Sequence, residues 1–166
     1  MSSSTTKRAI LYRFDRQPSE SLVHAETYLS EVGVEIMTRD GNLQSVDYTE
    51  VKALCFGAEG APADLFTSPA VFERRPKTAG LWTSFVLRDG DVLEGVLPHN
   101  LLEWPKQGYL LTPPRSGTYR QRVFIPRLAV RETVLRGMVG KPLQTVAKKS
   151  VQRGAPDTDR QLSMFD

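Results

Sequence analysis

The stretch WTSFVLRDGDVLEGVL, residues 82–97, decides the fold class. Two runs rich in β-branched and aromatic residues flank Asp89-Gly90, a dipeptide that supplies the positive backbone φ of a tight hairpin turn. Further runs of this kind follow at residues 108–112, 122–126 and 129–135, separated by irregular or turn-forming stretches. In this half, no stretch of ten residues has apolar side chains at helical spacing. Residues 80–138 therefore predict an all-β unit of five strands.

The first half of the chain repeats this arrangement. Its β-rich runs cover residues 9–15, 20–29, 34–38, 43–48 and 51–56, and Arg39-Asp40-Gly41-Asn42 forms a second hairpin turn. Aligned on their last strands, VKALCF (51–56) matches AVRETV (129–134), and VEIMT (34–38) matches YLLTP (109–113). Tandem duplication of one small unit explains the match. We expect units at residues 7–57 and 80–138, each closed into a barrel because closure removes exposed sheet edges.

The segments outside these units have a different composition. Residues 58–79 are rich in Gly, Ala and Pro, but Leu65, Phe66, Val71 and Phe72 have the spacing of a short helical turn packed on a barrel end. We expect a short helix or another ordered connector there. Residues 139–166 are polar and basic and are broken by Pro142, Gly154 and Pro156, which is typical of a flexible tail.

The hairpin residues carry a resemblance to a known fold. Residues 84–97 resemble the first signature of the Sm-like fold, with Leu93, Glu94 and Gly95 at its Leu-x-Gly positions, and the strands joined at residues 126–129 resemble the second signature. In that comparison Gly95 lies where a bent strand tolerates no side chain. The resemblance implies two tandem Sm-like (SH3-like) barrels.

A second resemblance covers residues 8–136. The chain is similar to a bacterial family of uncharacterised domains in which a KAxxF strand precedes a connector and a DGxxLxG turn. The matching residues are Lys52, Ala53, Phe56, Asp89, Gly90, Leu93, Gly95 and the stretch RVFIPRLAV at 122–130. This resemblance implies a fold and says little about activity.

Composition and charge limit the function classes. Of the 166 residues, 40% are apolar and 25% charged, as in soluble globular proteins, and no apolar run suits a signal peptide or a membrane span, so we expect a cytoplasmic protein. Residues 1–66 carry 6 basic and 10 acidic side chains, whereas residues 67–136 carry 11 and 6. The second half is thus the better candidate for binding a polyanion.

A nucleic-acid site in the second half would use Arg115, Arg120, Arg122 and Arg127, with Trp104 in an irregular loop as a surface aromatic for stacking. The alternative is a solvated sheet face. The uridine pocket of the bacterial Sm-like RNA chaperone needs a Lys-His pair, and the corresponding positions here are Pro126-Arg127 and Asp47-Tyr48. Neither copy offers that pocket.

Catalytic chemistry is sparsely supplied. Cys55 lies in an apolar run without a basic neighbour and is expected to be buried and inert, and Trp82 is expected in the core. His24 and His99 lack partners at ligand spacing, so no metal site is expected. Asp40, Asp89, Asp91 and Glu94 lie beside hairpin turns, where solvated carboxylates are the rule. We therefore expect no enzyme and no cofactor.

The peptide RQLSMFD, residues 160–166, follows the polar tail with three apolar side chains. Gln161, Leu162, Ser163, Met164 and Phe165 resemble the bacterial sliding-clamp-binding pentapeptide, with Met in place of Leu at its fourth position. The apolar side chains would fill hydrophobic clefts on the clamp while Gln161 fixes the register. The alternative is that they dock back on the barrels as a strap.

Three functional hypotheses remain open from the sequence. The leading one is a non-enzymatic accessory protein recruited to the replication or repair machinery through the sliding clamp. The second is a regulator that binds RNA or single-stranded DNA with its basic half, and the third is an adaptor whose barrels bind an unknown protein. The oligomeric state is left open.

Overall fold

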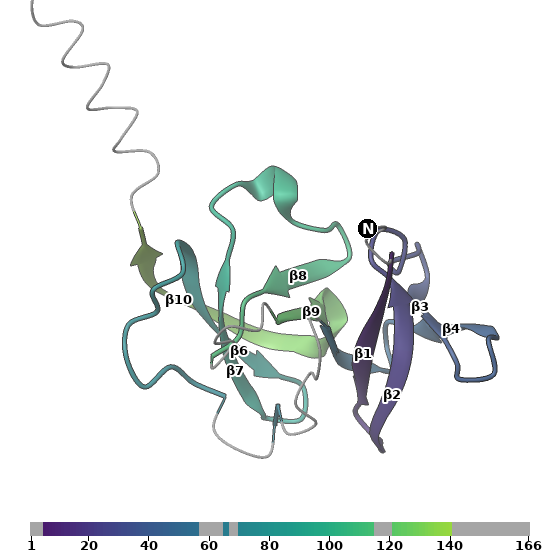
Figure 1. Cartoon of the computed structure of the whole chain (residues 1–166). Helices are drawn as coiled ribbons and strands as arrows, with labels where there is room; N and C mark the ends of the chain where they lie inside the picture. The colour runs from purple at the N-terminus through teal and green to yellow at the C-terminus, as the bar shows by residue number, and fades with distance from the viewer. Residues whose placement is uncertain (1–4, 57–64, 67–69, 115–120, 141–166) are drawn as a thin grey trace, which may run out of the picture.

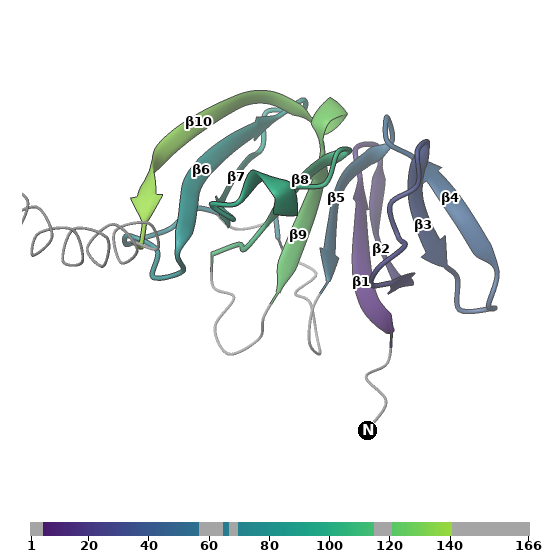
Figure 2. The ribbon, with the colours of Figure 1, turned by 90° about the horizontal axis from the view of Figure 1, so that it is seen from above.

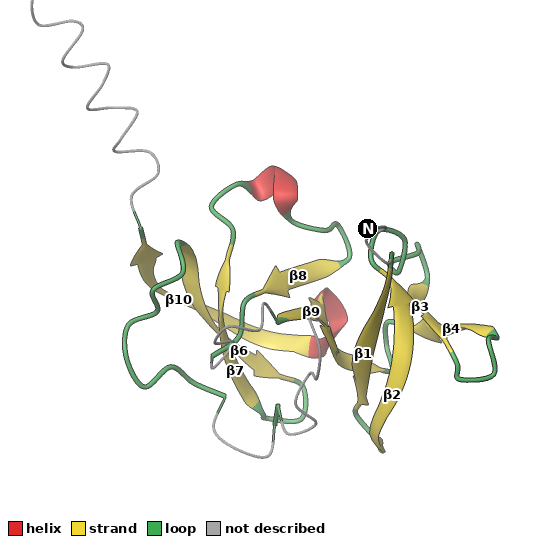
Figure 3. Ribbon diagram, in the orientation of Figure 1, coloured by secondary structure: helices red, strands yellow, loops and turns green. Residues whose placement is uncertain are grey.

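The computed structural model describes residues 5–56, 65–66, 70–114 and 121–140. The described residues form ten strands and two short 3-10 helices, and they contain no α-helix (Figures 1 and 3). The predicted all-β class is confirmed. No helix among these residues is long and apolar enough to cross a membrane.

The first half forms an antiparallel meander whose last strand returns to pair with the first. Its strand order is β4-β3-β2-β1-β5. The strands are β1 (Thr6–Arg13), β2 (Arg16–His24), β3 (Gly33–Met37), β4 (Leu43–Asp47) and β5 (Val51–Phe56). Five strands were predicted at these places. The second one ends at His24 rather than at residue 29, because the chain turns at residues 25–27.

The second half has the same connectivity. Its strands are β6 (Gly80–Leu87), β7 (Val92–Leu97), β8 (Gly108–Leu111), β9 (Arg122–Pro126) and β10 (Val130–Val139), with 3-10 helices η1 (Leu101–Glu103) and η2 (Arg127–Ala129). Strands β6 and β7 form the predicted hairpin, and Gly90 in its turn has a φ of 93°. Strand β10 pairs with β6, and an isolated bridge joins Val96 of β7 to Thr112, the residue that follows β8.

Pairing registers confirm that the two halves correspond residue by residue. Gly33 pairs with Asp47 in β3–β4 as Gly108 pairs with Pro126 in β8–β9. This matches the sequence alignment of VEIMT with YLLTP. Leu11 pairs with Leu54 as Phe85 pairs with Thr133, so VKALCF corresponds to VRETVL at residues 130–135. The alignment with AVRETV was wrong by one residue, because Ala129 belongs to η2.

The two halves share one sheet. Seven strands run in the order β4-β3-β2-β1-β5-β9-β8, and β10-β6-β7 forms a second sheet. Figure 2 shows β5 and β9 side by side where the halves meet, and Leu54, Cys55 and Phe56 of β5 pair with Phe124, Val123 and Arg122 of β9. The curled sheet therefore continues from one half into the other.

Two cores lie on the two sides of this junction. Leu54 and Phe124 belong to the core of the first half, whereas Cys55 and Val123 belong to that of the second. Phe124 comes from β9 but contacts Tyr28 edge-to-face in the first core, with ring centroids 6.1 Å apart. Each half thus supplies side chains to the core of the other, and burying such side chains is the main stabilising term in folding.

Of the two forms expected for the connector, the described residues take the one without a helix. Residues 70–79 contain bends and an isolated bridge from Ala70 to Leu93 and form no helical turn; residues 58–64 and 67–69 lie outside the described part. The expectation for Gly95 is confirmed by a packing contact. A Cβ atom on Gly95 would lie 2.3 Å from the Leu111 side chain.

Candidate functional site

The residues that carry the family resemblance meet where the two halves join. Lys52 lies on β5, and its Nζ contacts Asp91 and lies 2.6 Å from an oxygen of Asp89, both in the β6–β7 turn. The lysine side chain is only 9% exposed, whereas the aspartates are 33% and 45% exposed. The KAxxF strand and the DGxxLxG turn are therefore linked by one buried cation.

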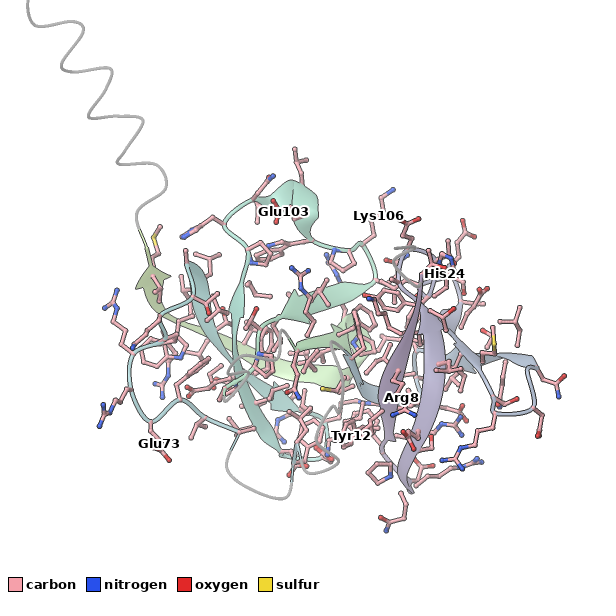
Figure 4. All side chains as sticks on the ribbon, viewed as in Figure 1. Arg8, Tyr12, His24, Glu73, Glu103 and Lys106 are labelled. Carbon is pink, nitrogen blue, oxygen red and sulfur yellow. The ribbon has the colours of Figure 1, made fainter. Side chains whose placement is uncertain are left out.

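Aromatic rings complete this charged cluster. The Phe66 ring centroid lies 4.1 Å from the Lys52 Nζ, a cation–π distance. Phe66 packs edge-to-face on Tyr12, and the Tyr12 hydroxyl accepts a hydrogen bond from the backbone N–H of Leu65. Figure 4 shows Tyr12 at the boundary between β1 and the second half. The cluster therefore draws on β1, β5, residues 65–66 and the β6–β7 turn.

Electrostatics hold this cluster in its charged form. Partial burial acts to raise the pKa of Asp89, but hydrogen bonds from Lys52 and from the backbone N–H of Asp91, with the charge of Lys52, lower it below its ordinary value of 3.8. The carboxylate stays ionised at neutral pH and its partner ammonium is engaged. A lysine ammonium held by two carboxylates has no free lone pair with which to attack a substrate or take up a proton, so the geometry suits a structural ion cluster.

One feature of the sequence, a lysine inside an otherwise apolar strand, indicated this cluster. Strand β5 is buried at all six positions, and a lysine inside such a strand needs a counter-charge because an unpaired buried ammonium is costly. Asp89 and Asp91 were interpreted only as solvated turn residues. That prediction is wrong in part, since both carboxylates are partly covered and bind Lys52.

Glu94 was also predicted to be solvated, and this is wrong. Its side chain is 4% exposed, and one carboxylate oxygen accepts hydrogen bonds from the Trp82 indole N–H at 3.0 Å and from the backbone N–H of Phe72 at 3.1 Å. Arg136 lies 3.8 Å from the other oxygen. Asp40, in the first hairpin turn, is exposed as predicted.

Trp82 is half-buried and lies outside both cores, so its predicted core position is wrong. Its indole N–H donates to Glu94, and its ring packs edge-to-face on Phe72, with centroids 6.3 Å apart. Glu94 and Trp82 therefore fix the segment that enters β6 against the hairpin. Both carboxylate oxygens of this buried side chain have partners among the described residues, which agrees with a structural role.

Cys55 is buried, as predicted, and burial raises the pKa of its thiol to about 11. His24 is exposed at the end of β2, whereas the His99 Nε2 lies 3.0 Å from the Val139 carbonyl oxygen. The described residues contain no group of three His, Cys, Asp or Glu side chains able to hold a metal ion.

Two of the four arginines of the predicted nucleic-acid site lie in the described part, one at each end of β9. Arg122 begins β9 and Arg127 follows its end, and both are exposed. Trp104 is half-buried, donates its indole N–H to the Pro98 carbonyl at 2.9 Å and packs on Tyr109. Arg115 and Arg120 lie outside the described residues. The nucleic-acid site stays a prediction.

Residues 141–166, which include the clamp-like peptide Gln161–Phe165, also lie outside the described residues, so that site stays a prediction too.

Comparison with known proteins places the chain in a family. No curated protein and no solved structure matches the chain. One family model matches residues 5–137, a range that contains all ten strands except the last two residues of β10. That range includes Lys52 and the β6–β7 turn. The chain therefore belongs to the family of unknown function DUF6982.

Proposed function

We propose that this protein is a non-enzymatic cytoplasmic adaptor that is recruited to the replication or repair machinery when its C-terminal peptide binds the bacterial sliding clamp. The observation that carries the proposal is the sequence Gln161-Leu162-Ser163-Met164-Phe165. A short peptide of this kind binds by placing apolar anchors in a hydrophobic groove, while the polar residues before and between them set its orientation.

The ten-stranded part of the chain would be the body that the peptide tethers to the clamp. We interpret its two halves as Sm-like barrels fused through β5 and β9, since both halves have the same strand order and matching registers. Strand β10 ends at Val139. An extended chain over residues 140–160 spans up to about 70 Å, so the peptide could reach a groove without any change in the barrels.

The arrangement of charged groups agrees with an adaptor better than with an enzyme. Lys52 is engaged by Asp89 and Asp91, and Glu94 is engaged by Trp82 and the backbone. Groups held in this way stabilise the fold instead of facing a substrate. The nucleic-acid hypothesis receives no comparable support, because Arg122 and Arg127 lie at opposite ends of β9.

The test is direct binding of the full-length protein to a purified bacterial sliding clamp by isothermal titration calorimetry. Phe165→Ala and deletion of residues 160–166 should abolish binding, because Phe165 is the terminal anchor of the peptide. Leu143→Ala, which changes an apolar residue of the same tail outside the motif, should bind like the wild type. Thermal unfolding should be the same for all four proteins.

Two results would contradict the proposal. The first is no detectable binding by the intact protein, and the second is binding that survives Phe165→Ala. A lower unfolding temperature after deletion of residues 160–166 would instead show that the peptide docks on the barrels. Affinity for single-stranded DNA or RNA that falls steeply with salt would favour the nucleic-acid hypothesis.

A further inference from the structure

The strand pairing that joins the two halves could form a second time, between the two outer strands of the molecule. Each half consists of five strands in the same order, and the contact between the halves joins the fifth strand of the first half, β5, to the fourth strand of the second half, β9. The remaining fourth strand is β4, and the remaining fifth strand is β10. In the described part of the chain, no strand pairs with the outer side of either.

These two edges lie on opposite sides of the molecule (Figure 2). Strand β4 therefore cannot pair with β10 of the same chain, but it can pair with β10 of another copy. The side chains of Arg75 and His99 contact the carbonyls of Met138 and Val139, at the end of β10. Residues 131–135 of β10 are left for such a contact.

The correspondence of the halves fixes the register that this contact would have. In β4 and β5 each residue corresponds to the residue 79 positions later, as Leu54 corresponds to Thr133 and Val46 to Ile125. The pairing of Leu54, Cys55 and Phe56 with Phe124, Val123 and Arg122 then translates directly. It places Thr133, Val134 and Leu135 of one copy opposite Ser45, Gln44 and Leu43 of the next.

The side chains at these positions fit one another. Leu43 is 74% exposed and Leu135 is 60% exposed, and the register places them directly opposite, where cross-strand neighbours cover each other. Four positions further along, Arg131 falls opposite Asp47, a pair of opposite charges. Edge strands usually carry charges or prolines that discourage pairing, and β10 does carry Arg131, Glu132 and Arg136. Both edges, however, also carry exposed leucines at matching places.

We infer that this protein assembles head-to-tail with further copies of itself by pairing of β10 with β4 of the next copy. The two surfaces in this contact differ, so the contact is heterologous and leads to a closed ring or an open chain of copies. Thr133 with Ser45 replaces the Leu54–Phe124 pair of the internal junction. The contact between copies is therefore more polar than the one within the chain, and it depends on concentration.

The first experiment measures the molar mass of the full-length protein by size-exclusion chromatography with light scattering over a range of concentrations. The wild type should exceed the 18.6 kDa of one chain, and its mass should rise with concentration. Leu43→Lys and Leu135→Lys should each reduce it to one chain, since either lysine blocks one edge. Leu102→Lys is the control, because Leu102 is 93% exposed in η1 and belongs to neither edge.

The second experiment mixes the two edge variants. Leu43→Lys keeps an intact β10, and Leu135→Lys keeps an intact β4, so an equimolar mixture should form dimers of twice the monomer mass and nothing larger. A contact between identical surfaces cannot give this complementation. A monomeric wild type at every concentration would overturn the inference, as would assembly that persists in each edge variant alone. Because both edges are exposed, circular dichroism should show unchanged folding in all variants.

Discussion

Substitutions in the cluster of Lys52, Asp89 and Asp91 can show whether the stability of the fold depends more on the cation or on the carboxylates. The lysine side chain is 9% exposed, and Asp89 and Asp91 are 33% and 45% exposed. Water can solvate the carboxylates when the lysine is absent, but it reaches the lysine poorly when the carboxylates are absent. Removing the carboxylates should therefore cost more stability than removing the cation.

The structure sets the size of the two effects. Lys52→Met keeps an unbranched apolar chain against the Phe66 ring, so the free energy of unfolding should fall by about 1 kcal/mol. The double variant Asp89→Asn and Asp91→Asn leaves a buried ammonium without a counter-charge, which costs about 3–5 kcal/mol. With a urea m-value of about 1–3 kcal/mol/M, the double variant should unfold at least about 1 M earlier than the wild type.

Equilibrium urea unfolding followed by circular dichroism measures these differences. Asp40→Asn is the matched control, because Asp40 also precedes the glycine of a hairpin turn but is exposed, and its change should stay within about 0.5 kcal/mol. If Lys52→Met lowers stability as much as the double variant does, the assignment of the cost to the buried cation is wrong.

Three further predictions concern acid, the thiol and two glycines. The pKa of Asp89 is lowered in the folded protein, so the stability it supplies is present above about pH 4 and is lost as the pH falls through its folded pKa; Asp89→Asn should flatten this part of the pH profile of unfolding. Cys55 is buried and the pKa of its thiol is about 11, so a thiol reagent at pH 8 should label it only after denaturation, and rapid labelling of the native protein would contradict this. A Cβ atom on Gly33 or on Gly108 would lie 2.1 Å from a carbonyl oxygen of the neighbouring strand, so alanine at either position should lower the free energy of unfolding by about 2 kcal/mol or more. Gly137→Ala is the control, because its Cβ would lie 4.0 Å from its nearest neighbour, and urea unfolding should show almost no change.

Local patterns were enough to predict the strands and the repeat. The Asp89-Gly90 turn and the flanking β-rich runs identified the β6–β7 hairpin, and VEIMT and YLLTP proved to be equivalent strands. The last strands were misaligned by one residue, because VKALCF is buried throughout whereas VRETVL is largely exposed. Their side-chain patterns therefore contain no common register.

The joining of the halves was not predicted, because β5 and β9 are far apart in the sequence and strand propensity does not specify partners. A signal was nevertheless present. VKALCF and the last four residues of RVFIP are buried without alternation, which is typical of strands covered on both faces. Two such strands in a duplicated chain indicate that they lie centrally, between the two cores.

The cluster around Lys52 could not be predicted from local sequence patterns either. Each of its motifs was recognised separately, as a KAxxF strand and as a hairpin turn. Their contact depends on how the second half is placed against the first, and this is a consequence of the pairing of β5 with β9. Once that pairing is known, the lysine of β5 and the turn of the β6–β7 hairpin have to be interpreted together.

The β5–β9 contact within the chain and the β10–β4 contact between copies differ in strength for a physical reason. Within the chain, Leu54 and Phe124 are fully buried and the Lys52 cluster adds a second link, so the halves should stay together at any dilution. Between copies, the equivalent pair is Ser45 with Thr133, and Leu43 and Leu135 are the main apolar side chains that become buried. Such a contact responds to local concentration. Recruitment of several copies to one partner through the tail would raise that concentration, so deleting residues 160–166 should leave assembly in dilute solution unchanged while removing any enhancement of assembly by the clamp.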